Sequence, residues 1–129
     1  MQKQILVPDE KGRIFARALR VGNHLYMAGM TGQWDLETWE PLPEAVGNIE
    51  VQTRQAFEWM KRVLAQCGLS FEHIVKLTTF IRNIDDLPKV GAIRSEYLPR
   101  PTFVGTAVQV SGFIGTADLE IEAEAVFPE

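Results

Sequence analysis

Three glutamates recur at every second position near the end of the chain, in the segment LEIEAEAVF. In an extended strand alternate side chains point to opposite faces, so Glu120, Glu122 and Glu124 share one face and the apolar residues share the other. A face with three like charges is commonly just solvated. If another subunit covers that face, a carboxyl loses part of its water, its pKa rises and it suits general acid–base catalysis. Both interpretations stay open from these residues alone.

Arg94 is a second residue whose type and place could carry chemistry. The segment 87–98 has the spacing of an amphipathic helix, and both Gly91 and Arg94 fall inside its apolar stripe. An arginine in such a stripe commonly extends its charged end to the rim of the apolar surface. The alternative is an arginine aimed into a cleft, where it would bind an anion.

Arg100 stands between two prolines in the segment PRPTFVGT. It could bind a substrate anion at the mouth of a site, but bidentate recognition of a carboxylate demands a specific geometry. The simpler interpretation is a solvated charge at a rigid corner of the chain.

Other kinds of site have little support. His24 and His73 lie far apart and neither has a second ligand at metal spacing, so we expect no metal site. No Ser-His-Asp arrangement can be assembled, and Cys67 ends an apolar helical face, where a buried and inert thiol is expected. The net charge of −4 and the scattered Lys and Arg argue against nucleic-acid binding.

The composition predicts one ordinary globular domain spanning residues 1–129. Hydrophobic residues make up 46% of the chain and charged residues 23%. The single cysteine allows no internal disulfide and fits a reducing compartment. No signal-peptide run and no stretch of membrane-spanning length is present, so we expect a cytoplasmic protein that does not bind membranes.

The elements that must position these residues follow from periodicity and turn signals. We expect strands over 3–8, two arms of a hairpin within 17–32 and strands over 73–83, 103–113 and 119–127; helices over 49–67 and 86–98; and a loop over 33–48. The order β-β-β-α-β-α-β-β predicts an α+β fold, a six-stranded mixed sheet with two helices packed on one face. The other face then needs cover that a monomer of this size lacks.

Several stretches together carry a resemblance to a known family. They are VGNHLYMAGMTG, QTRQAFEWMKRVLAQCGLSFEHIVKLTTFIRNIDDL, the proline corner and LEIEAEAV. From about Phe15 to Phe127 the chain resembles the RidA/YjgF/L-PSP family. The resemblance implies a chorismate-mutase-like fold and a homotrimer with sites in the clefts between subunits. It also implies hydrolysis of reactive enamines and imines, such as 2-aminoacrylate, to a 2-keto acid and ammonia without metal or organic cofactor.

The resemblance also assigns site residues. Glu120 matches the carboxylate that positions the attacking water, and the backbone of Gly29 faces the cleft. The arginine that binds the substrate carboxylate in typical deaminases falls on Phe103, or on Gly105 if the strand is aligned from its far end. The remaining counterparts, a tyrosine, a serine and an asparagine in the family, are Phe15, Ala28 and Gly91.

We therefore expect a divergent homotrimer that hydrolytically deaminates a small enamine or imine, with Glu120 as the catalytic residue. The alternative is a non-catalytic trimer that binds a small molecule in an apolar pocket containing Phe15 and Phe103. The ribonuclease activity reported for some relatives fits the acidic balance poorly. Without the family arginine the cleft should disfavour anionic substrates, unless Arg94 or Arg100 takes its place.

Overall fold

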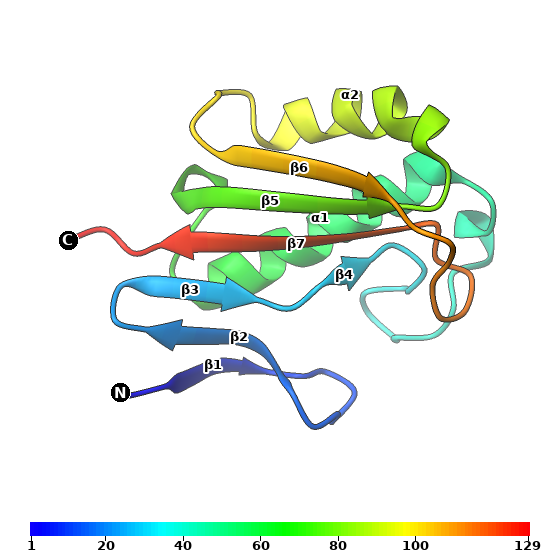
Figure 1. Ribbon diagram of the computed structural model, residues 1–129. Helices are drawn as coiled ribbons and strands as arrows, with labels where there is room; N and C mark the ends of the chain where they lie inside the picture. The colour runs from blue at the N-terminus through cyan, green and yellow to red at the C-terminus, as the bar shows by residue number, and fades with distance from the viewer.

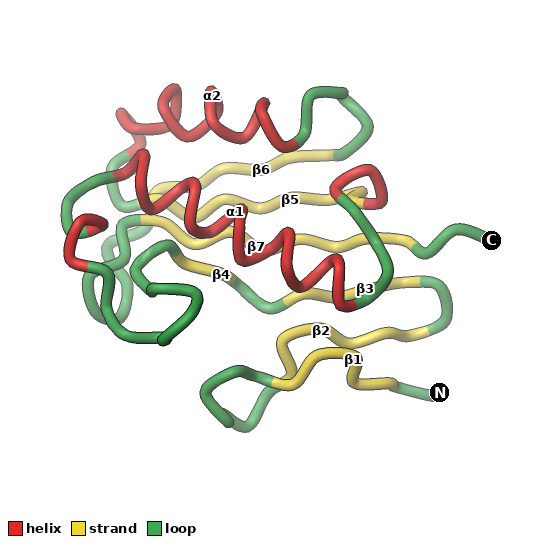
Figure 2. Tube along the Cα trace, turned by 180° about the vertical axis from the view of Figure 1, so that it is seen from behind, coloured by secondary structure: helices red, strands yellow, loops and turns green.

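The computed structural model describes residues 1–129 and has one sheet with both helices behind the same face (Figure 1). The view from behind shows α1 crossing in front of the strands and α2 running beside the β6 edge of the sheet (Figure 2). In chain order the elements are β1 (Gln4–Pro8), β2 (Ala16–Val21), β3 (His24–Met27), β4 (Met30–Thr31), α1 (Ile49–Gln66), β5 (Ile74–Ile81), α2 (Leu87–Tyr97), β6 (Val104–Gln109) and β7 (Leu119–Val126). Short 3₁₀ turns precede α1, β5 and α2.

The strand order is β1-β2-β3-β7-β5-β6, and the short strand β4 pairs with β7. All pairs are antiparallel except β5 with β6, whose parallel pairing requires a crossover connection, and α2 provides it. The predicted α+β class with two helices on one face of a mixed sheet is confirmed. β4 adds a seventh strand to the six that were expected.

Strand β7 has the alternation that its sequence predicted. Leu119, Ile121, Ala123 and Ala125 are buried, and Glu122 and Val126 on the other face are exposed. Because neither helix covers that face, it stays open in the protomer. Tyr26 on β3 and Val108 on β6 are large side chains that remain exposed.

Helix α1 begins and ends as predicted. The Asn48 side chain accepts a hydrogen bond from the Val51 amide at 3.1 Å. Gly68 follows the helix with a φ of +74°, a left-handed conformation that favours glycine. The buried residues of α1 include Ala56, Phe57, Met60, Val63 and Leu64. The amphipathic pattern therefore identified the face that packs on the sheet.

Two predicted boundaries were wrong. Asp86 was expected to cap α2, but its side chain makes no capping hydrogen bond. Asn83 caps a 3₁₀ turn over Ile84–Asp86 instead, and that turn leads directly into α2. The strand expected over 103–113 ends at Gln109, after which residues 110–118 leave the sheet as a loop and turn at Gly115, where φ is +71°. This loop forms part of a cavity wall.

Neither helix combines the length and the apolar character that crossing a membrane would require.

Candidate active site

A cavity of about 300 Å³ lies beside β4 and brings together predicted site residues from distant parts of the chain. Phe15 precedes β2, Ala28 and Gly29 connect β3 to β4, and Glu120 comes from β7. The loop after β6 adds Phe113 to the wall. These four predicted residues share one site within a single protomer.

Glu120 and Gly29 are in direct contact within this cavity. β4 pairs with β7 so that Thr31 stands opposite Glu120. A β-carbon added to Gly29 would lie 2.7 Å from both Cδ and Oε2 of Glu120. The Glu120 carboxyl therefore packs against the Gly29 backbone, in space that the β-carbon of any other residue at position 29 would fill.

Burial raises the pKa of Glu120 above its ordinary value. The negative charge of Glu122 raises this pKa further, and the positive charge of Arg17 lowers it. No hydrogen bond is among these influences, so the carboxyl oxygens are free to bond with a ligand or a water molecule. A raised pKa makes a carboxyl better suited to both accept and return a proton.

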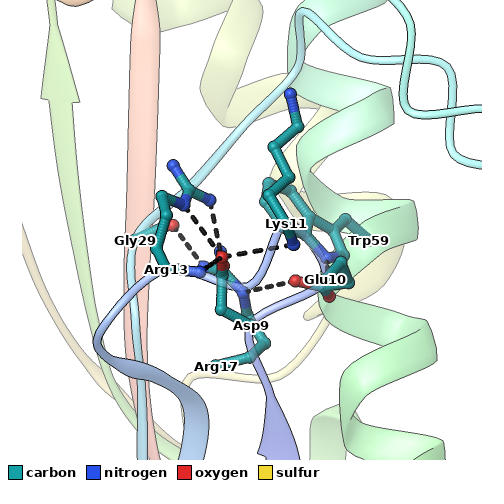
Figure 3. Close-up of polar contacts among 7 residues, drawn as sticks. All are labelled: Asp9, Glu10, Lys11, Arg13, Arg17, Gly29 and Trp59. Carbon is teal, nitrogen blue, oxygen red and sulfur yellow. Dashed lines mark hydrogen bonds and ion pairs between the residues drawn. The ribbon is translucent and has the colours of Figure 1, made fainter.

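Arg17 is a buried arginine beside this carboxyl that sequence reasoning did not place in the site. Its side chain is 1% exposed, and it forms ion pairs with Asp9 (Nη2 to Oδ1, 2.9 Å) and Glu10 (Nε to Oε1, 3.1 Å). Its Nη1 also donates to the carbonyl oxygen of Gly29 at 2.7 Å (Figure 3). The adjacent acids at positions 9 and 10 were the only local signal for this cluster.

Trp59 joins helix α1 to the same cluster. The Arg17 guanidinium carbon lies 4.2 Å from the centre of the indole ring, and the Trp59 Nε1 donates to Glu10 Oε2 at 2.8 Å. Lys11 stands over the ring of Trp34, with its Nζ 3.1 Å from the ring centre. Two tryptophan rings in the cavity wall therefore each pack against a cation, Trp59 against Arg17 and Trp34 against Lys11.

A second cavity, of about 210 Å³, lies between α2 and the β5–β6 pair. It contains four further predicted residues: Gly91, Arg94, Phe103 and Gly105. It shares no lining residue with the cavity around Glu120. Within one protomer the predicted site residues therefore lie in two separate cavities.

Arg94 has an unsatisfied polar group in this second cavity. Its Nε is the one buried side-chain nitrogen or oxygen without a hydrogen-bond partner in the protein. The guanidinium carbon lies 5.9 Å from the centre of the Phe103 ring, and no carboxylate forms an ion pair with it. A buried donor without a partner is costly, which makes this position suited to an anion.

Arg100 lines neither of these two cavities. It is exposed beside a third hollow, together with Phe71, Glu72 and Leu98. This placement agrees with the interpretation of Arg100 as a solvated corner residue. Across the whole chain, no three His, Cys, Asp or Glu side chains converge to hold a metal ion.

Comparison with known proteins places the chain in a family. The family model described as Endoribonuclease L-PSP matches residues 10–127. A RutC family protein of Pyrococcus abyssi is 32% identical over 112 residues, which cover 87% of this chain and 84% of that protein. A 2-iminobutanoate/2-iminopropanoate deaminase of Dermatophagoides farinae is 31% identical over the same shares of the two chains.

The fold is shared with solved structures of the same kind. A protein of the conserved Rid family from Yersinia pestis has a TM-score of 0.85 and 29% identity, covering 97% of this chain and 99% of that one. A putative endoribonuclease of Thermotoga maritima has a TM-score of 0.79 and 30% identity, covering 98% and 95%. The chain belongs to the RidA/YjgF/L-PSP family, as its sequence motifs predicted.

Proposed function

We propose that this protein hydrolytically deaminates small enamines or imines. The observation that carries the proposal is the half-buried Glu120 carboxyl, free of hydrogen bonds and packed on Gly29 in a cavity of about 300 Å³. The name of the Dermatophagoides farinae relative describes an imine deaminase, which supports the same chemistry.

The reaction needs only water and a group that moves protons. Glu120 accepts a proton from a water molecule as the water oxygen bonds to the carbon of the C=N group, whose second bond breaks as the nitrogen takes a proton from solvent. The resulting carbinolamine loses ammonia as the C–N bond breaks with the Glu120 proton passing to nitrogen, and its hydroxyl releases a proton to solvent to leave a carbonyl group. Because its pKa is raised, Glu120 can return the proton to the leaving nitrogen, and no metal or organic cofactor takes part.

We also propose that the complete site forms between copies of the chain in a homotrimer. The open sheet face needs cover, and the predicted residues lie in two separate cavities of one protomer. Subunit packing would bring the Arg94 cavity of one copy to the Glu120 cavity of the next. The buried Nε of Arg94 then supports binding of a substrate carboxylate, and Arg94 rather than Arg100 replaces the missing family arginine.

A second candidate function is binding of a small molecule without turnover. The aromatic wall around Glu120, with Phe15, Trp34, Trp59 and Phe113, favours it because such rings hold planar ligands. The two functions differ in whether product is released.

The decisive experiment measures ammonia release from an imine that an amino-acid oxidase generates in the assay. Glu120→Gln should slow the release by roughly 10²-fold and leave the assembly intact. Glu124→Gln is the matched control on the same strand and face, because Glu124 lies outside the cavity and is not among the charges that act on Glu120. Unchanged turnover in Glu120→Gln contradicts the proposed chemistry, and tight ligand binding without turnover in the unaltered protein favours the second candidate.

A further inference from the structure

Arg17 makes two hydrogen bonds to the backbone at Ala28 and Gly29, and Glu120 packs against Gly29. Its main-chain oxygen accepts a hydrogen bond from the Ala28 amide at 2.9 Å, and its Nη1 donates to the Gly29 oxygen at 2.7 Å. Residues 28 and 29 lie between β3 and β4, outside both strands. The direction of the backbone at this point in the cavity therefore depends on one residue of β2.

The positive charge of Arg17 is held in place by a neutral cluster. Asp9 and Glu10 pair with it, and Asp9 also pairs with Arg13, so two carboxylates face two guanidinium groups (Figure 3). Trp59 secures Glu10 from the helix side. Since these charges balance, Arg17 can stay buried without an external anion.

Arg17 is the cation in the cavity wall that acts on the ionisation of Glu120. Arg13, Arg17 and Glu120 are the only charged residues that line the cavity, and Arg13 is 47% exposed and bound to Asp9. Neither β4, α1 nor the loop 110–118 brings a charged side chain to the wall. Glu122, the other charge that acts on Glu120, has the same sign and opposes its ionisation.

We propose that Arg17 is a positioning residue for the reaction. It orients the Gly29 peptide, and its positive charge favours the ionised form of the Glu120 carboxyl, the form that can take a proton from water. The catalytic consequence rests on the proposed function. The electrostatic part holds for the protein without substrate and can be measured separately.

The test follows the titration of Glu120 by carbon NMR in the assembled, substrate-free protein, with the signal assigned by its loss in Glu120→Gln. Arg17→Gln removes the charge that lowers the pKa of Glu120 and should therefore raise this pKa. Arg17→Lys keeps the charge and should leave this pKa near that of the unaltered protein. Arg20→Gln is the matched control, because Arg20 is on the same strand and bonds to the Gly22 carbonyl away from the cavity.

Equal Glu120 titrations in Arg17→Lys and Arg17→Gln would overturn the proposal and leave Arg17 as a structural clamp only. If Arg17→Gln does not fold, the double variant Arg17→Gln with Glu10→Gln removes one charge of each sign and takes its place in the comparison. The acid limb of kcat/KM should move with the titration. A titration that shifts in a protein with no deaminase activity would reject the proposed function and keep the electrostatic role of Arg17.

Discussion

The carboxyl group of Glu120 occupies the space next to Gly29 where any other residue would carry its β-carbon. The added atom would stand 2.7 Å from Glu120 Cδ, well inside van der Waals contact. The obstructing atoms belong to the end of a flexible side chain, so the carboxyl can move aside while the backbone stays in place. Gly29 therefore sets where the Glu120 carboxyl lies in the cavity.

Gly29→Ala should lower kcat by about 10²-fold without unfolding the protein, because a displaced carboxyl no longer reaches the attacking water. Steady-state kinetics and thermal unfolding measured together check this. Gly112→Ala is the control, since a β-carbon there makes only ordinary contacts of 3.5 Å or more with Arg82. Full activity in Gly29→Ala would show that Glu120 does not need its observed position.

The unaltered protein should have a mass of three times 14.5 kDa by light scattering at micromolar concentration. Val108→Glu places a charge on the open sheet face and should shift the mass toward that of the monomer. Val46→Glu adds the same charge to an exposed valine in the turn before α1 and should not. If the unaltered protein is a monomer, the proposal of a site formed between copies of the chain is wrong.

Imines that carry a carboxylate should be turned over faster than those made from the corresponding amide. Arg94→Ala should abolish this preference, because Arg94 is the cation that lines the second cavity and its Nε has no partner in the protein. Arg100→Ala should retain it, since Arg100 lies in a different hollow. Comparing kcat/KM for the two imines in each variant measures the effect. A preference for the amide form in the unaltered protein would instead support the expectation from the sequence that the cleft disfavours anionic substrates.

Asp9→Asn should destabilise the protein at pH 7 and have a much smaller effect in acid. Hydrogen bonds from the Arg13 side chain, with a smaller contribution from Arg17, hold the pKa of Asp9 well below its ordinary value of 3.8. A depressed folded-state pKa stabilises the protein fully above the unfolded value of 3.8, and this stabilisation is lost progressively as the pH falls from there through the depressed folded value. Urea unfolding at pH 7 and at a pH well below 3 tests this, with the exposed Asp85→Asn as the control. An equal loss at both pH values would contradict it.

Local periodicity was enough to predict the elements that carry most of the core. The alternation of β7 and the capped, amphipathic α1 both depend on residues close in sequence, so their buried faces followed directly. The start of α2 did not, because Asn83 and Asp86 are both good capping residues and the intervening 3₁₀ turn decides between them.

The candidate site was predicted less completely, because its parts meet only through tertiary structure. The contact between Glu10 and Trp59 joins residues 49 positions apart, and no local pattern announces it. An arginine in a short strand is normally solvated, so the burial of Arg17 could not be inferred from β2 itself. The resemblance identified Glu120 and Gly29, which the structure places in contact.

The separation of the two cavities bears on how this protein could change over evolutionary time. Residues near Glu120 come from the N-terminal strands and their loops, α1, the loop 110–118 and β7, whereas the Arg94 cavity comes from α2, β5, β6 and the residue before β6. Substitutions in α2 would therefore reshape the Arg94 cavity and leave the surroundings of Glu120 unchanged. Such independence lets the two cavities change separately, with Gly91 and Phe103 on one side of that division and Gly29 on the other.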